Sequence, residues 1–124
     1  MKMGEAIRIA RLQKDVRVPD EVLIQWVNQV EGIVQSDVLL VNTDDIMQYT
    51  ERDMPCTLLV KPPHDKLYVS YLLSQIDLYN ADYERYAYSK RVFDDDLLSF
   101  KKWFITAYQP ADHLEDEENF CYAK

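Results

Sequence analysis

Apolar and aromatic residues recur every three or four positions through the segment 63–110, and this spacing places them on one face of a helix. Neither Gly nor Pro interrupts the segment between the prolines at its two ends, where a helix tolerates Pro. The pattern predicts a long helical hairpin or one kinked helix. Two breaks stay open, at 80–82 and at 88–89, because Asp82 or Ser89 could each cap the helix that follows.

Two shorter helices are expected earlier in the chain. The first spans Gly4–Lys14, with apolar residues on one side and a basic strip on the other. The second begins near Pro19, since Pro followed by two acidic residues is a strong helix start. It runs to about Gln35 with a broad apolar stripe. The hairpin is expected to pack on this second helix, with Trp26 and Phe100 buried between them.

The segment 37–62 has a different pattern and is expected to form a long arm. Its two short apolar runs, 38–41 and 57–60, are typical of one or two short strands, arranged as a loose hairpin. A loop of this length in a small domain is often functional or disordered. Isolated apolar residues on such an arm need a surface to contact. The candidates for a partner interface are Met47, Tyr49 and Met54.

A chain of 124 residues is most simply one domain, and the fold class expected is mainly α. Residues 1–110 would form a single helical domain. Residues 111–124 form an acidic tail that is expected to be flexible or to order on a partner. Phe120 and Tyr122 alternate around Cys121, which would put both rings on one side of an extended segment. Both rings are therefore further interface candidates.

The acidic balance limits the classes of partner. Twenty-two Asp and Glu against 14 Lys and Arg give a net charge of −8. The segments 1–18, 19–62, 63–110 and 111–124 carry +3, −6, −1 and −4. Such a surface repels a phosphate backbone, which argues against ordinary nucleic-acid binding. No signal peptide and no apolar run long enough to cross a membrane is recognisable, so a cytosol-like folding compartment and no membrane partner are expected.

The residues predict contact with other proteins rather than catalysis. Two glycines exclude a glycine-rich phosphate loop, and two cysteines are too few for a structural zinc site. His64 and His113 stand alone, and a surface or capping role is expected for His64. Successive helix positions point about 100° apart, so the carboxylates of 94–96 cannot converge on one metal ion. No catalytic, cofactor-binding or metal site is expected.

Several segments, taken in order, resemble small neck proteins of tailed bacteriophages, the head–tail connector or adaptor family. They are EAIRIARLQKD, PDEVLIQWVNQVEGIV, QYTERDMPCTLLVKPPHDKLYVSYL and IDLYNADYERYAYSKRVFDDDLLSFKKWFITAYQP. The strongest pieces are TLLVKPPHDKLY and IDLYNADYERY. The resemblance covers residues 5–110 and leaves the acidic tail outside.

The resemblance implies a mostly helical subunit that assembles into a ring, typically a dodecamer, beneath the portal protein of the capsid. Such a ring extends the DNA channel and offers a platform to the next neck or tail protein, while genomic DNA passes without specific binding. The expected location is the neck of the virion, after synthesis in the cytoplasm of the bacterial host. The alternative from the charge alone is an acidic inhibitor or DNA-mimicking regulator of a host protein.

Overall fold

The computed structural model describes residues 1–14, 17–46 and 48–107, and it confirms the mainly α fold class. The elements are α1 (Met3–Gln13), α2 (Asp20–Ile33), the π-helical turn η1 (Val34–Val38), the 3-10 turns η2 (Thr43–Asp45) and η3 (Glu51–Asp53), α3 (Lys66–Tyr79) and α4 (Tyr83–Ala107).

The segment 63–110 holds two helices, and the break lies at the first of the two predicted places. The chain turns through Ala81 in a left-handed conformation, with φ at 58°. The backbone N–H of Asp82 then donates to the carbonyl of Asp77 at 2.9 Å, and the Asp82 carboxylate accepts the backbone N–H of Arg85 at 3.3 Å. Asp82 thus satisfies one of the N–H groups that a helix start leaves open. Ser89, the other candidate cap, lies buried inside α4.

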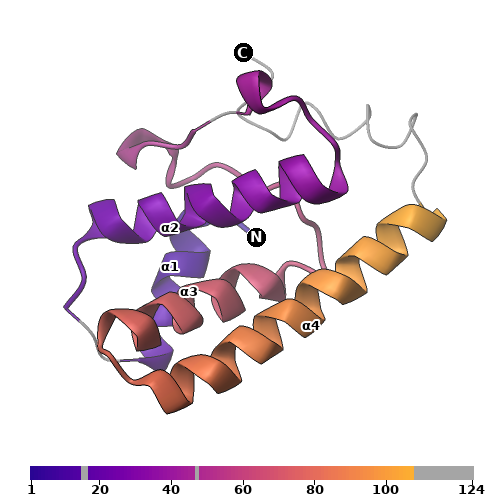
Figure 1. Ribbon diagram of the computed structural model, residues 1–124. Coiled ribbons are helices and arrows are strands. Elements are labelled where there is room, and N and C mark those ends of the chain that lie inside the picture. Colours follow the sequence, from indigo (N-terminus) through magenta and orange to yellow (C-terminus); the bar gives the residue numbers. More distant parts are fainter. Residues whose placement is uncertain (15–16, 47, 108–124) are drawn as a thin grey trace.

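Helices α3 and α4 run antiparallel and side by side, α2 lies against α3 on the side away from α4, and α1 packs behind (Figure 1). The apolar stripe of α2 and the buried faces of α1 and α3 meet in one core. Helix α4 has 25 residues against 14 in α3. At about 1.5 Å per residue it is longer by roughly 16 Å. Its last turns therefore extend past the start of α3, as Figure 1 shows.

The two large rings expected between α2 and the hairpin are both buried, but each packs on a different partner. The Trp26 ring meets Tyr79 edge-on, with centroids 6.2 Å apart, near the hairpin turn. The Phe100 ring lies 5.8 Å from His64 and 6.1 Å from Trp103, at the other end of α3. The two buried rings thus form separate aromatic contacts at opposite ends of the hairpin.

The arm is bound to the N-terminus rather than extended into solvent. The first N–H groups of a helix have no partner within it. In α1 they are satisfied by the arm: Met3 donates to the carbonyl of Cys56 at 3.0 Å and Gly4 to that of Met54 at 2.9 Å. Leu58 in turn donates to the carbonyl of Met1 at 2.9 Å. Within the described ranges the strand-like pairing amounts to one isolated bridge, between Lys2 and Thr57.

Phe100 offers the test of the hairpin core. Replacing Phe100 by Ala should lower the free energy of unfolding by about 3–5 kcal/mol, because it opens a cavity at a buried ring. The matched control is Ile105→Ala on the same helix, where the side chain is 73% exposed and the loss should stay within about 0.5 kcal/mol. Chemical denaturation measures both. Equal losses in the two variants would show that this face of α4 is not core.

Candidate functional site

A fully buried carboxylate, that of Glu31, lies where α2, the arm and α3 meet. Its Oε2 atom accepts the hydroxyl of Tyr49 at 2.9 Å and the backbone N–H of Leu59 at 3.1 Å. Its Oε1 atom accepts the hydroxyl of Tyr68. An ionised carboxylate only accepts hydrogen bonds, so three donors and no competing acceptor suit it. One side chain thus joins three segments that are far apart in the sequence.

The Tyr68 hydroxyl links Glu31 to a second backbone group of the arm. It accepts the backbone N–H of Val60 at 2.8 Å while it donates to Glu31. Glu31, Tyr68 and Val60 are buried, and a buried backbone N–H without a partner is costly. Glu31 and Tyr68 therefore satisfy two successive backbone donors of the segment 57–60. Thr57 forms an isolated bridge with Lys2, and side chains satisfy the next two backbone donors, those of Leu59 and Val60.

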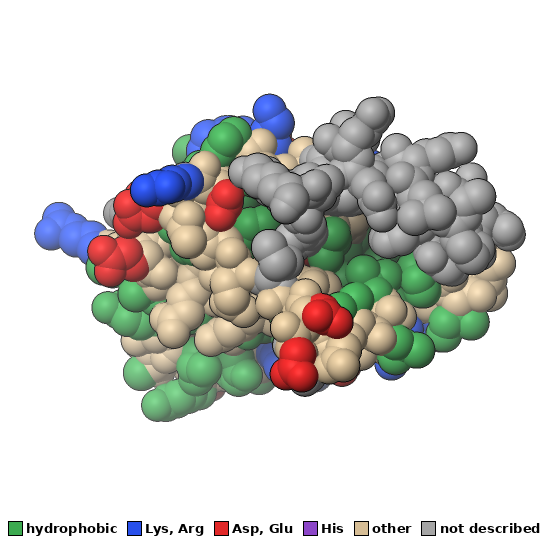
Figure 2. Space-filling view, turned by 90° about the horizontal axis from the view of Figure 1, so that it is seen from above, with side chains coloured by type: hydrophobic (Ala, Val, Ile, Leu, Met, Phe, Trp, Pro, Cys, Tyr) green, Lys and Arg blue, Asp and Glu red, His purple; other side chains and the backbone are tan. Residues whose placement is uncertain are grey.

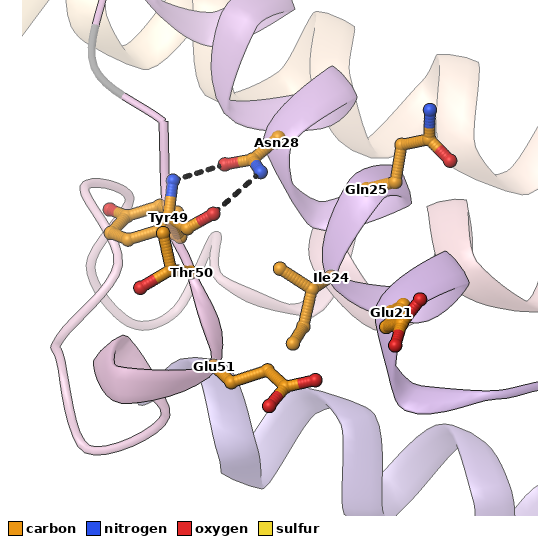
Figure 3. Close-up of a pocket in the computed structure, with 7 residues that line it drawn as sticks. All are labelled: Glu21, Ile24, Gln25, Asn28, Tyr49, Thr50 and Glu51. Atoms are coloured by element: carbon orange, nitrogen blue, oxygen red, sulfur yellow. Dashed lines mark hydrogen bonds between the residues drawn. The ribbon is translucent and has the colours of Figure 1, made fainter.

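One turn before Glu31 on α2, the side-chain amide of Asn28 holds the other half of the arm. Its Oδ1 atom accepts the backbone N–H of Tyr49 at 2.6 Å, and its Nδ2 atom donates to the carbonyl of Tyr49 at 3.0 Å (Figure 3). This pair of bonds mimics the pairing of two strands. Tyr49 is held both by its backbone and by its hydroxyl, so the arm has one register on α2.

The electrostatics of the cluster are set first by burial. Loss of hydration raises the pKa of Glu31, and its hydrogen bonds with Tyr68, Leu59 and Tyr49 oppose that rise without cancelling it. Burial together with the neighbouring Glu31 charge also raises the pKa of Tyr68 well above its usual value, so the phenol stays protonated and keeps donating. The cluster is therefore suited to holding segments together.

A second buried carboxylate fixes the opposite side of the molecule. Asp77, 3% exposed, forms a salt bridge with Lys14 at the end of α1 and accepts the hydroxyl of Ser89 at 2.6 Å. These contacts join α1, α3 and α4. They also explain why Ser89 does not break the helix: its hydroxyl is used in bonding across the hairpin.

Beside the Asn28–Tyr49 clamp, α2 and the arm enclose a shallow groove of about 280 Å³. Ile24 lies in the middle of it, with the carboxylates of Glu21 and Glu51 on either side (Figure 3). Both carboxylates are exposed, whereas Ile24 is buried. An apolar floor between two negative charges favours a ligand with an aliphatic part and a cationic group.

The structure corrects one of the five predicted interface residues. Tyr49, expected to be exposed, is buried inside the subunit because its hydroxyl binds Glu31. Met54 is half-buried and packs against Gly4, so only part of it could contact a partner. Met47, Phe120 and Tyr122 lie outside the described residues, and their interface role stays a prediction.

The acidic run 94–96 behaves as a surface feature. Asp94 pairs with Lys90 at 2.6 Å, and Asp96 lies 3.7 Å from Lys66 and accepts the hydroxyl of Ser70 at 2.6 Å. In the described part of the chain, no group of three or more His, Cys, Asp or Glu side chains could hold a metal ion. None of its helices is long and apolar enough to cross a membrane.

Large hydrophobic side chains are exposed at both ends of the hairpin. The space-filling view shows hydrophobic groups at two places along one edge, with acidic groups between them (Figure 2). Those exposed on the hairpin are Leu78, Tyr79, Tyr83, Tyr88, Leu98, Trp103 and Ile105. Tyr and Trp suit surfaces that become partly buried on assembly, since each has an apolar body and a polar edge.

Sequence reasoning missed Glu31, Asn28 and Asp77. For Glu31 a signal was present: the residue stands inside the apolar stripe of α2, between Val30 and Val34. A charged residue on the core face of an amphipathic helix needs buried partners. Asn28 and Asp77 carry no comparable signal, because their partners are set by tertiary packing.

No protein-family model, curated protein or solved structure matches the chain.

Removing one hydroxyl at a time tests the Glu31 cluster. Tyr68→Phe leaves both Val60 N–H and one carboxylate oxygen without a partner, and should lower the free energy of unfolding by about 3 kcal/mol. Tyr49→Phe removes one bond to an oxygen that keeps Leu59, and should cost about 1.5 kcal/mol. The control, Tyr83→Phe, alters a 67% exposed ring and should change little. Urea denaturation gives the order, and equal losses in all three variants would contradict it.

The raised pKa of Glu31 predicts a particular pH dependence. Because the folded pKa lies above the 4.5 of the unfolded chain, the folded state binds the extra proton between these values. Protonation of Glu31 therefore adds to the free energy of unfolding. This contribution is complete below pH 4.5 and is lost as the pH rises through the folded pKa. The free energy of unfolding of the wild type minus that of Glu31→Gln should therefore fall from pH 4.5 to pH 7. A flat or rising difference would contradict this sign.

Proposed function

We propose that this chain is a structural subunit of the head–tail neck of a tailed bacteriophage. It assembles as a ring, with twelve copies as the expected number, beneath the portal protein. The ring extends the DNA channel and supports the next neck or tail protein. The sequence resemblance over residues 5–110 supports this proposal, and so does a fold whose buried polar groups are used for internal attachment.

The observation that carries the proposal is the exposed apolar surface of the hairpin. Among the described residues, seven of nine exposed large hydrophobic side chains lie on the hairpin, which makes it the surface least suited to water. Leu98 and Ile105 are seven residues apart on α4 and so share one face, 49% and 73% exposed. Ile105 lies beyond the start of α3, because Asp96, nine residues earlier on α4, already pairs with Lys66, the first residue of α3. A projecting helix end of this kind suits contact with a protein above or below a ring.

The distribution of charge fits passage of DNA without binding. An acidic chain offers few phosphate contacts, and those contacts supply most non-specific affinity for DNA. A ring of such chains would let the genome slide through its channel. In this role the protein needs neither cofactor nor metal, and its localisation is the neck of the virion.

The alternative role, as an acidic inhibitor or DNA mimic, has less support from the described surface. A mimic needs a continuous array of unpaired negative charge. Several acidic side chains are instead next to cations: Asp94 at Lys90, Asp82 at Arg85 and Asp96 at Lys66. Half of the net charge lies in 111–124. We therefore favour the neck role.

Attachment to capsids tests the proposal. Purified full-length chain, added to portal-bearing heads that lack it, should attach as a ring visible by electron microscopy. The double variant Leu98→Glu/Ile105→Glu should attach at least about tenfold more weakly, because two buried charges replace apolar contacts.

Arg91→Glu is the matched control, since it lies exposed on the same helix and changes the net charge by the same amount. It should attach like the wild type. Failure of the wild type to attach would overturn the proposal. Equal attachment of the double variant would remove the role assigned to the projecting end of α4.

A further inference from the structure

We propose that the groove between α2 and the arm receives the exposed face of α1 from a second copy of this chain. The contact joins Arg8 and Leu12 of one copy to Ile24, Glu21 and Glu51 of the next. It names the surfaces by which subunits of the proposed ring bind one another, and so rests on that proposed function.

The groove is a preformed surface. Its two walls are held together by the bonds between the Asn28 side chain and the backbone of Tyr49 (Figure 3). Tyr49 is fixed again by its hydroxyl bond to Glu31. A binding surface that is already ordered loses little conformational entropy when it is occupied. Its floor is the buried side chain of Ile24, and the carboxylates at its rim, those of Glu21 and Glu51, are exposed.

The face of α1 that points away from the core has the complementary character. Arg8 and Leu12 are four residues apart, so they lie one above the other on one helix face. The opposite face, which includes Ala6 and Ala10, is buried in the core. Leu12 is 74% exposed and Arg8 is exposed. This face therefore presents the aliphatic side chain of Leu12 beside the cation of Arg8, and neither is buried within its own subunit.

The other cations of α1 are already occupied. Arg11 pairs with Asp20 of α2, and Lys14 pairs with the buried Asp77. Within the described ranges Arg8 makes no such ion pair, and neither does Glu21 or Glu51. The structure therefore leaves one cation on α1 and two carboxylates on the groove for contacts outside the subunit.

Charge selects the occupant. Residues 1–18 carry a net +3 and residues 19–62 a net −6, so the first segment of one copy is attracted to the second segment of another. The chain's own tail is disfavoured in the groove, because five carboxylates in 111–124 would face two more. An arginine is suited to the rim, since its planar guanidinium can bind carboxylates through several N–H groups.

The contact joins two different surfaces of the same protein. Such head-to-tail contacts close into rings when the rotation between neighbours closes. On each subunit the groove lies on α2 and the arm, whereas the exposed apolar groups of the hairpin lie on α3 and α4. Neighbours within a ring and components above or below it would then use separate surfaces.

Charge reversal in the full-length chain tests the contact. Arg8→Glu puts three acidic groups together, and Glu21→Lys/Glu51→Lys puts three cations together. Each variant alone should weaken self-association at least about tenfold in sedimentation equilibrium, because like charges brought together at an interface are strongly unfavourable. Mixed in equal amounts, the two variants should associate like the wild type, since each face then meets its complement.

Two further variants complete the design. Leu12→Ser should weaken association without any change of charge, which guards against a general electrostatic effect. Arg91→Glu, on α4, is the charge-matched control and should associate like the wild type. Circular dichroism checks that every variant is folded; all of the altered side chains are exposed, so the fold should be kept.

The outcomes separate this inference from the proposed function. If the wild type forms rings but the charge-reversed variants also do, or if mixing restores nothing, the groove is not the subunit contact and the neck role stands. If the wild type remains monomeric at high concentration, this inference is overturned. Attachment of single copies or of none to portal-bearing heads then decides the proposed function separately.

Discussion

The structure depends on the burial of one carboxylate. Glu31 lies in the apolar stripe of α2, where a charge is tolerated only if hydrogen-bond donors surround it. Tyr49 and Leu59 of the arm and Tyr68 of α3 supply these donors. The requirement works in both directions: the arm must fold back to satisfy Glu31, and Glu31 must be present to hold the arm. A helix pair alone would leave this charge unsolvated.

From this constraint the rest of the chain follows in order. With the segment 57–60 held by Glu31 and Tyr68, the neighbouring carbonyls of Met54 and Cys56 reach the first N–H groups of α1. Helix α1 is thereby set against α3, and its last turn brings Lys14 to Asp77. The two buried carboxylates thus lie at the two ends of one connected series of contacts. The groove beside Asn28 is a consequence of it, because the clamp fixes the distance between its walls.

The sequence predicted those parts of the fold that depend on local signals. Pro19 and the two acidic residues after it mark the start of α2, and the three-to-four periodicity marks the hairpin. The place of the break was open, because Asp82 and Ser89 have equal capping chemistry. A contact across the hairpin, from Ser89 to Asp77, decides it. Tyr49 was wrongly expected to be exposed for the same reason: its partner, Glu31, is 18 residues away in the sequence.

The tyrosines show why composition alone could not assign roles here. Tyr49 and Tyr68 use their hydroxyls internally, on a charge that burial makes expensive. Tyr83 and Tyr88 belong to the same tyrosine-rich segment as Tyr68, but they point out from α4 and are 67% and 71% exposed. The same residue type therefore serves two purposes, and only its position relative to Glu31 separates them. The inner tyrosines hold the arm to α2 and α3, whereas the outer ones leave their rings on the surface of the hairpin.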